Sequence, residues 1–285
     1  MDIGQRVSAS MPHPWNEDLT WQALRGLELG TALCACDGYY HTLWGALRIA
    51  GLNNTMKGEG PILTSLMAPY LRDDARVMIG GSADPGVLCG IGRVYAPRMP
   101  RFTVIDNCRA PLALIKEFAA TNEVACRTLH RDLLSLDGSE LWDQIVLHYT
   151  PDFMDAPDRG PLFRCLAASL APGGTLVCAT MTGASIPLEQ RQEMEAAFFE
   201  RAVAALKETP MATHAQSPEF KQQLRGYSAC RTGRRLGLPT VDGICDLVQA
   251  AGLRVLHEHA TSRARRLLVG MDVVDTSSII IASRS

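Results

Sequence analysis

The spacing of apolar residues changes near residue 75. Before it, apolar positions about three to four residues apart predict two helices within 16–50. A polar loop over Gly51–Gly60 follows, and then a third helix over Pro61–Tyr70 with Pro61 in its first turn. Beyond residue 75, short apolar runs predict strands at 76–80, 102–106, 125–130, 144–149, 175–180, 254–260 and 277–283. The segments between the strands favour helices near 86–96, 110–121, 158–170, 188–207 and 240–253.

Alternating strands and helices of this kind favour an α/β fold with a doubly wound, mostly parallel sheet and helices on both faces. We divide the chain into an N-terminal helical lid over 1–72 and a sheet domain over 73–285. The segment at about 208–237 fits neither pattern, because it combines prolines and glycines with several arginines. It is interpreted as an insertion, either a cap or a flexible loop. Its arginines could recognise a carboxylate or phosphate, but a solvated loop is the favoured interpretation.

Composition and charge favour a small-molecule partner. The formal net charge is -2, which gives no electrostatic reason to expect nucleic acid or an anionic membrane. No apolar stretch is long enough to span a bilayer, and the N-terminus lacks the apolar core of a signal peptide. We therefore expect a cytoplasmic protein, and the sequence leaves a homodimer open.

The cysteines predict a reduced protein without a metal site. Most of the nine lie inside apolar runs, where a free cysteine behaves as a small hydrophobe, and no C-x-x-C pair occurs. Cys34 and Cys36 are two residues apart, and on a helix their side chains would point in different directions. A joint metal site at this pair is not expected.

Polar residues gather where the predicted strands end. In ARVMIGGSADPGVL, the first strand runs into small residues that either connect two elements or hold a ligand against exposed backbone. The second strand ends at Asp106, which could accept hydrogen bonds from a ribose diol or act as a helix N-cap. Asp132 follows the third strand, and His148–Thr150 ends the fourth. Because carboxyl ends of parallel strands share one edge of a sheet, this pattern indicates a ligand site.

These segments resemble the class I S-adenosylmethionine-dependent methyltransferases. The resemblance runs from about Arg76 to Thr180 and rests on the small-residue loop, FTVID, RDLLSL, WDQIVLHYT and LAPGGTLVCAT. It implies a seven-stranded sheet ordered 3-2-1-4-5-7-6, with an antiparallel last strand, and S-adenosyl-L-methionine as cofactor. The cofactor-binding residues implied by it are Gly80, Gly81, Ser82 and Asp84 toward the methionine part, Asp106 at the ribose, Asn107, Cys108, Asp132 and Leu133 around the adenine, and His148 beneath the sulfonium.

The first loop departs from the family pattern. Ile79 stands where an acid is common, and the loop reads G-G-S-A-D-P-G in place of G-x-G-x-G. We expect Asp84, or the backbone N–H groups of 81–84, to contact the methionine moiety. The sequence alone favours Asp84 as the N-cap of a helix that begins at Pro85, and both roles can coexist.

Aromatic residues of the lid supply the candidate substrate site. Tyr39, Tyr40, His41 and Trp44 lie within little more than one helical turn, although core packing is the favoured role of Trp44. The candidate substrate-binding residues are Tyr39, Tyr40, Tyr149 and Phe153, and the candidate catalytic residues are His148, His41 and Tyr40.

Three functions are compatible with these residues. The first is methylation of a small molecule. The second is intramolecular cyclisation of the aminocarboxypropyl chain to a cyclic amino acid with release of methylthioadenosine, as some members of the superfamily do. The third is a non-catalytic binding module, which the acids at Asp106 and Asp132 argue against.

Overall fold

The computed structural model describes residues 15, 17–53, 55–182, 188–233, 240–268 and 271–284. Its helices are α1 (Leu19–Leu33), α2 (Tyr40–Ile49), α3 (Thr55–Met67), α4 (Gly86–Tyr95), α5 (Arg109–Thr121), α6 (Ala156–Ala168), α7 (Arg191–Leu206), α8 (Ala212–Gln216), α9 (Pro218–Gly233) and α10 (Val241–Ala250). Its strands are β1 (Arg76–Gly80), β2 (Arg101–Asp106), β3 (Cys126–His130), β4 (Trp142–His148), β5 (Leu170–Thr182), β6 (Arg254–Leu268) and β7 (Met271–Ser283). None of the helices described is long and apolar enough to cross a membrane.

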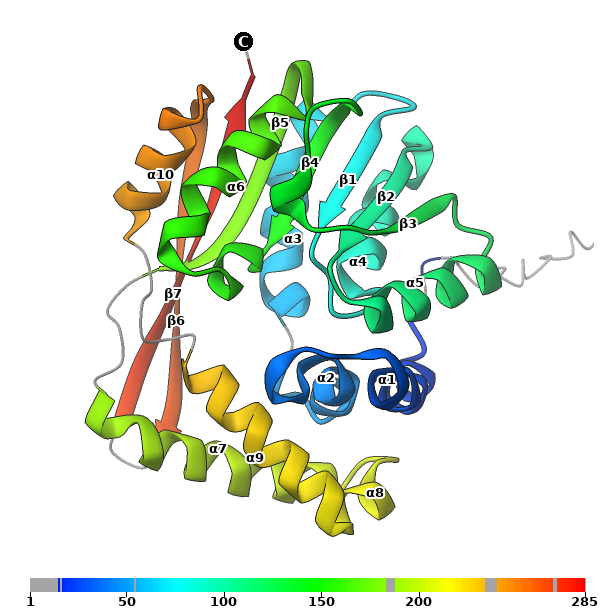
Figure 1. Cartoon of the computed structure of the whole chain (residues 1–285), viewed down its shortest axis with the longest axis vertical. Helices are drawn as coiled ribbons and strands as arrows, with labels where there is room; N and C mark the ends of the chain where they lie inside the picture. The colour runs from blue at the N-terminus through cyan, green and yellow to red at the C-terminus, as the bar shows by residue number, and fades with distance from the viewer. Residues whose placement is uncertain are drawn as a thin grey trace, which may run out of the picture.

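The strands form one seven-stranded sheet in the order β3-β2-β1-β4-β5-β7-β6. All pairs from β3 to β5 are parallel, whereas β7 pairs antiparallel with both β5 and β6. The predicted order and the antiparallel last strand are confirmed. β6 and β7 are longer than predicted, and their paired ribbon extends beyond the sheet toward α7 (Figure 1).

Apolar side chains on the strands alternate between two helical layers. Val77, Ile79 and Val104 face a core built with α3, α4 and α5, whereas Met78, Ile105 and Ile145 face a core built with α6 and α10. This alternation is the period of two that a strand imposes on its side chains. The strands buried on both faces therefore form the centre of a three-layered domain.

A third apolar cluster lies below the sheet in Figure 1 and forms a cap. It combines α1 and α2 with α7, α8 and α9, and includes fully buried Leu43, Leu47 and Leu224. The segment near 208–237 is thus largely helical: α8 and α9 occupy it up to Gly233, and residues 234–239 lie outside the described ranges. The flexible-loop alternative is wrong for the described part, because α9 buries an apolar face against α7 and α2. The division of the chain at residue 72 stays a prediction.

The third helix begins earlier than predicted. α3 starts at Thr55, so Pro61 lies inside the helix and the expected loop ends before it. Packing explains the difference, because the Met56 methyl group fills the space beside Gly90 of α4, while Leu63 and Met67 are fully buried. α3, which lies within the predicted lid over 1–72, packs on a face of the sheet, whereas α1 and α2 belong to the cap.

α1 and α2 approach each other through glycines. The buried face of α1 includes the small residues Ala23, Gly26 and Gly30, whereas Leu24 is exposed. A Cβ atom added at Gly30 would lie 2.4 Å from the Cα of Thr42 on α2. Only glycine permits this distance between the two backbones.

The substitution Gly30→Ala should therefore force the two helices apart and lower the free energy of unfolding by about 1–3 kcal/mol. Gly26→Ala, on the same helix, is the matched control, because its added Cβ would lie 3.7 Å from Leu114 in ordinary contact. The control should be neutral or stabilising by up to about 1 kcal/mol. Denaturant unfolding measures both, and equal effects of the two substitutions would contradict the close approach.

Candidate functional site

A cavity of about 760 Å³ lies between the cap and the carboxyl ends of β1, β2 and β4. The residues that line it come from the loop after β1, the ends of β2 and β4, the turn after β3, and the cap helices. The predicted site residues among them are Gly81, Ser82, Asp84, Asp106, Asn107, Asp132, Leu133, His148, Tyr149, Phe153, Tyr40 and His41. The structure therefore gathers most of the predicted residues around one space.

Three predicted residues are not among the lining residues. Gly80 is the last residue of β1, and an added Cβ there would meet Leu147 and Leu133. Tyr39 is 44% exposed and its ring packs beside Gly226 of α9. Cys108 is buried behind the cavity, at the start of α5.

Backbone hydrogen bonds fix the loop after β1 against β2. Gly81 has a φ of 73°, and its N–H donates to the carbonyl of Ile105. The next N–H, that of Ser82, donates to Asp106 Oδ2 over 3.0 Å. These two hydrogen bonds, both within the chain, therefore hold the turn open toward the cavity.

Asp84 connects this loop to the cap. Its Oδ1 accepts from the N–H of Gly86, and its Oδ2 accepts from Trp44 Nε1 and Arg48, each over 2.9 Å. α4 begins at Gly86 and its N-cap is Pro85, one residue later than predicted, but Asp84 still satisfies the first helical N–H. Trp44, expected in the core, lines the cavity and binds Asp84.

Arg48 of α2 binds two carboxylates at once. It pairs with Asp84 and, over 2.6 Å, with Glu17 ahead of α1. Burial opposes the charge on the guanidinium, but attraction to Asp84 and Glu17 outweighs it and raises the pKa of Arg48. Burial also raises the pKa of Glu17, against the attraction of Arg48. Spacing in the sequence gave no sign of this network.

Asp106 ends β2 with both oxygens on backbone donors. Oδ2 accepts from Ser82 and Oδ1 accepts from the N–H of Cys108 over 2.7 Å. Burial raises the pKa of Asp106, and the nearby His41 counteracts that increase. α5 has Cys108 as its N-cap, so Asp106 is not the cap of that helix. Each carboxylate oxygen has a second lone pair for a ligand.

Asp132 lies at the rim of the same cavity. It is exposed, and its Oδ1 accepts from the N–H of Leu134, which makes it the N-cap of the 3-10 turn Leu133–Ser135. Because Asp132 is exposed and lines the cavity, a ligand and water can both reach its carboxylate.

His148 presents an unpaired nitrogen at the end of β4. Its Nε2 is buried and has no hydrogen-bond partner among the described residues, with Glu59 Oε2 4.0 Å away. Burial lowers the pKa of His148 to about 4, although the charge of Asp84 acts to raise it. Burial lowers the pKa of His148 more than the charge of Asp84 raises it, and Glu59 lies beyond hydrogen-bond distance.

Glu59 is a functional candidate that sequence reasoning missed. It belongs to α3, in the stretch that was expected to be a loop. Its Oε2 accepts from the hydroxyl of Tyr149 and its Oε1 accepts from Ser277 Oγ, so both oxygens are held beside His148. Tyr149 has a φ of 63°, a left-handed backbone that is uncommon for a non-glycine residue and recurs at functional sites.

The cap closes the cavity with aromatic rings. Tyr40 stacks on Tyr227 with centroids 5.6 Å apart and meets Trp44 at 5.2 Å and Phe153 at 4.8 Å. The predicted substrate-binding residues Tyr40 and Phe153 are therefore neighbours. Arg231 of α9, expected in a solvated loop, donates to Asn53 and lies over the ring of Phe198.

His41 faces sulfur atoms. Its Nδ1 is 3.5 Å from Cys34 Sγ. Burial acts to lower the pKa of His41, but hydrogen bonds with the thiols of Cys108 and Cys34 outweigh it and raise the pKa to about 9. The expectation that Cys34 and Cys36 diverge is wrong, because they follow α1 and are not part of a helix.

No family model matches the chain, and no curated protein matches it. Solved structures do resemble it. N-methyltransferase NodS from Bradyrhizobium japonicum WM9, in complex with S-adenosyl-L-homocysteine, is 14% identical with a TM-score of 0.53, covering 94% of this chain and 99% of that chain. An S-adenosylmethionine-dependent methyltransferase from Methanosarcina mazei is 15% identical with a TM-score of 0.50, covering 77% of this chain and 96% of its own. The chain has the class I methyltransferase fold.

Some matches carry other descriptions. A "possible exported protein" from Bordetella parapertussis is 18% identical with a TM-score of 0.50, covering 80% of this chain and 68% of that one. At such identities the likeness concerns the fold alone. The cofactor, substrate and catalytic roles of individual residues stay predictions.

The burial of His148 predicts a pH dependence of stability. Its pKa lies near 4 in the folded chain and near 6.5 in the unfolded chain, so the unfolded state binds more protons between these values. Its contribution is complete above pH 6.5 and is lost as the pH falls toward 4, by at most about 3 kcal/mol. His148→Gln should remove this part of the decline in the free energy of unfolding, whereas His214→Gln, at an exposed position, should not. Parallel curves for wild type and His148→Gln would contradict it.

Proposed function

We propose that the chain is an S-adenosylmethionine-dependent methyltransferase that acts on a small molecule. The single observation that carries this proposal is the buried carboxylate of Asp106 at the end of β2, in the same cavity as His148 at the end of β4. A doubly wound sheet binds ligands at this edge. The fold described above supports the same cofactor.

The residues of the cavity fit the cofactor by chemistry. The Asp106 carboxylate suits a ribose diol, exposed Asp132 suits the adenine end, and the loop Gly81–Asp84 would lie at the methionine end. When bound, the cofactor supplies an electrophilic methyl group on a sulfonium. The buried and unpaired Nε2 of His148 needs a partner, which a ligand in the cavity would provide.

The chain contributes position, exclusion of water and a proton acceptor. Tyr40 and Phe153 offer a non-polar wall for a planar substrate, and α2 covers the strand ends. His148 is neutral at physiological pH because burial lowers its pKa to about 4, so its ring can accept a proton from a nucleophile but is a weak base unless the charged form is stabilised. Glu59, fixed by Tyr149 and Ser277, would stabilise the resulting imidazolium. A small-molecule partner, a cytoplasmic location and a homodimer stay predictions.

One observation favours the second candidate, cyclisation of the aminocarboxypropyl chain. Both oxygens of Asp84 are engaged by Gly86, Trp44 and Arg48. Oδ2 has two donors and Oδ1 has one, so Asp84 keeps a single lone pair for the methionine amine, and the amine would be held differently from the usual way. The loop sequence, in which Ile79 stands where an acid is common, suggests the same difference at the methionine end.

Incubation of the chain with S-adenosylmethionine and a set of small acceptors distinguishes the candidates. A methyltransferase should release S-adenosylhomocysteine together with a methylated acceptor, as measured by mass spectrometry. Release of methylthioadenosine in the absence of an acceptor would identify the reaction as cyclisation and would contradict methyl transfer. Absence of either product from a chain that binds S-adenosylhomocysteine would leave the binding module as the function.

Cofactor binding tests Asp106 directly. Asp106→Ala should weaken the binding of S-adenosylhomocysteine by about 1.5–3 kcal/mol in calorimetry, the value for a hydrogen bond to a charged group. The matched control is Asp143→Asn at the opposite edge of the sheet, because Asp143 also accepts from a backbone N–H, that of Arg76. Unchanged affinity in a folded Asp106→Ala protein would show that Asp106 does not bind the cofactor and only accepts the hydrogen bonds of Ser82 and Cys108.

A further inference from the structure

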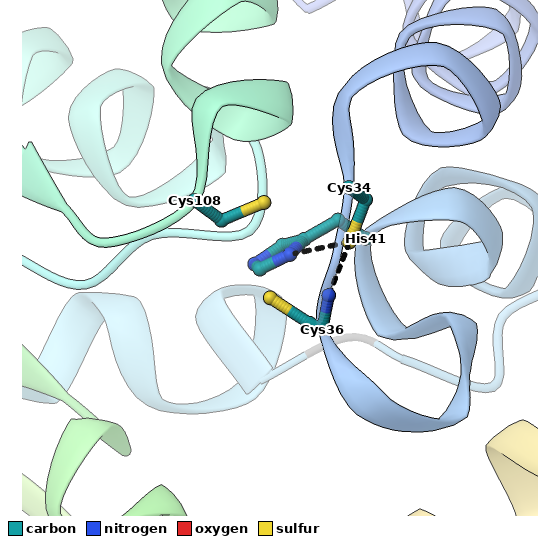
Figure 2. A group of neighbouring side chains, drawn as sticks. All are labelled: Cys34, Cys36, His41 and Cys108. Carbon is teal, nitrogen blue, oxygen red and sulfur yellow. Dashed lines mark hydrogen bonds between the residues drawn. The ribbon is translucent and has the colours of Figure 1, made fainter.

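Four metal-ligating side chains meet beside the cap, outside the chemistry proposed above. They are Cys34, Cys36, His41 and Cys108, and one ligand atom from each lies within 4.8 Å of all the others. Figure 2 shows the three sulfur atoms arranged around the imidazole ring of His41. All four residues are buried or half-buried, and the cysteines are not in disulfides.

The backbone explains why the group forms. Cys34 (φ -87°, ψ 123°) and Cys36 (φ -76°, ψ 146°) have extended conformations between α1 and the 3-10 turn Asp37–Tyr39. In extended chain, residues two apart point to the same side, so both thiols face the same space. His41 enters from the first turn of α2, and Cys108 from the N-cap of α5.

The observed distances are close to those of a tetrahedral site. Zn²⁺ binds sulfur at about 2.3 Å and nitrogen at about 2.0–2.1 Å, which places tetrahedral sulfur and nitrogen ligands about 3.6 Å apart. Cys34 Sγ and His41 Nδ1 are 3.5 Å apart. The N–H of Cys36 donates to Cys34 Sγ over 3.4 Å, a contact of the kind that stabilises a metal-bound thiolate. The remaining atoms, within 4.8 Å, need to move inward by only about 1 Å to reach the sulfur separations of such a site.

We propose that Cys34, Cys36, His41 and Cys108 bind one Zn²⁺ ion in a closed tetrahedral site. Three sulfurs and one imidazole are a ligand set of structural zinc, and four protein ligands leave no open position for catalysis. The ion would join the connection between α1 and α2 to the start of α5, two residues after Asp106. It would therefore hold the cap on the sheet whatever ligand the cavity binds.

Metal analysis of the full chain, purified under reducing conditions, tests the proposal. We expect about one zinc per chain after dialysis against metal-free buffer. Replacement by Co²⁺ should give the visible absorption of a tetrahedral ion and the ultraviolet charge-transfer band of cobalt bound to thiolate. A folded, reduced wild-type chain that neither retains Zn²⁺ nor acquires these bands would overturn the proposal. So would a disulfide between two of Cys34, Cys36 and Cys108, located by mass spectrometry of its peptides in the protein purified under the same reducing conditions.

Substitutions assign the ligands. Cys36→Ser and Cys108→Ser should each weaken Zn²⁺ binding by more than about 100-fold, since loss of a mere supporting partner costs about 10–100-fold. Cys245→Ser is the matched control, because Cys245 is half-buried on α10 and its thiol lies by Glu258. Its Zn²⁺ affinity should equal that of the wild type. Full affinity in folded Cys36→Ser and Cys108→Ser chains would overturn the assignment.

A conservative variant keeps the test decisive where a serine variant does not fold. Cys36→His should retain the Co²⁺ complex with a weaker thiolate band, because one sulfur ligand is replaced by nitrogen. An undiminished band would exclude Cys36 from the site. A chelator should also lower the melting temperature of the wild type, and an unchanged melting temperature after complete removal of zinc would overturn the role in holding the cap.

Discussion

The pairing of Arg48 with Glu17 and Asp84 holds the cap over the strand ends. Glu17 precedes α1, Arg48 belongs to α2 and Asp84 lies in the loop after β1, so three separate segments meet at one guanidinium. The side chains of Arg48 and Asp84 are only 11% and 7% exposed. Removing one partner from such a pair costs about 3–5 kcal/mol, because the other charge stays buried without compensation. The contact between the cap and the loop after β1 therefore depends on all three charged side chains being present together.

The loop after β1 also connects this ion pair to Asp106, and Asp106 is connected in turn to the cap through Cys108. Ser82 donates its hydroxyl to the carbonyl of Asp84 and its N–H to Asp106, which accepts the N–H of Cys108. Cys108 belongs with His41 of α2 to the four-residue cluster (Figure 2). α2 thus meets the sheet domain at both of its ends, at the Asp84 carboxylate beyond β1 and at the Cys108 sulfur beyond β2.

The sequence predicted the parts of the fold that are encoded locally. Apolar runs and the acids that follow them are short-range signals, and they identified the strands and the positions of Asp106 and Asp132 after them, whereas the strand order came from the resemblance to the class I methyltransferases. The missed features depend on contacts between distant segments. α3 continues through Pro61 because Met56 packs beside Gly90, and Cys108 lies more than one supersecondary unit away from Cys34. Spacing within one segment cannot reveal a ligand that another segment supplies.

The cavity has two walls of different chemistry, and they have different origins in the chain. The strand ends contribute polar groups that backbone N–H donors hold in place, such as Asp106. The cap contributes aromatic rings, Tyr40 and its neighbour Tyr227, and Tyr40 also meets Phe153 from the turn that follows β4. In the proposed function the first wall would recognise a constant cofactor and the second a particular acceptor. Because Tyr227 comes from α9, the inserted helices take part in shaping the acceptor side, and changes there can alter the substrate without disturbing the strand ends.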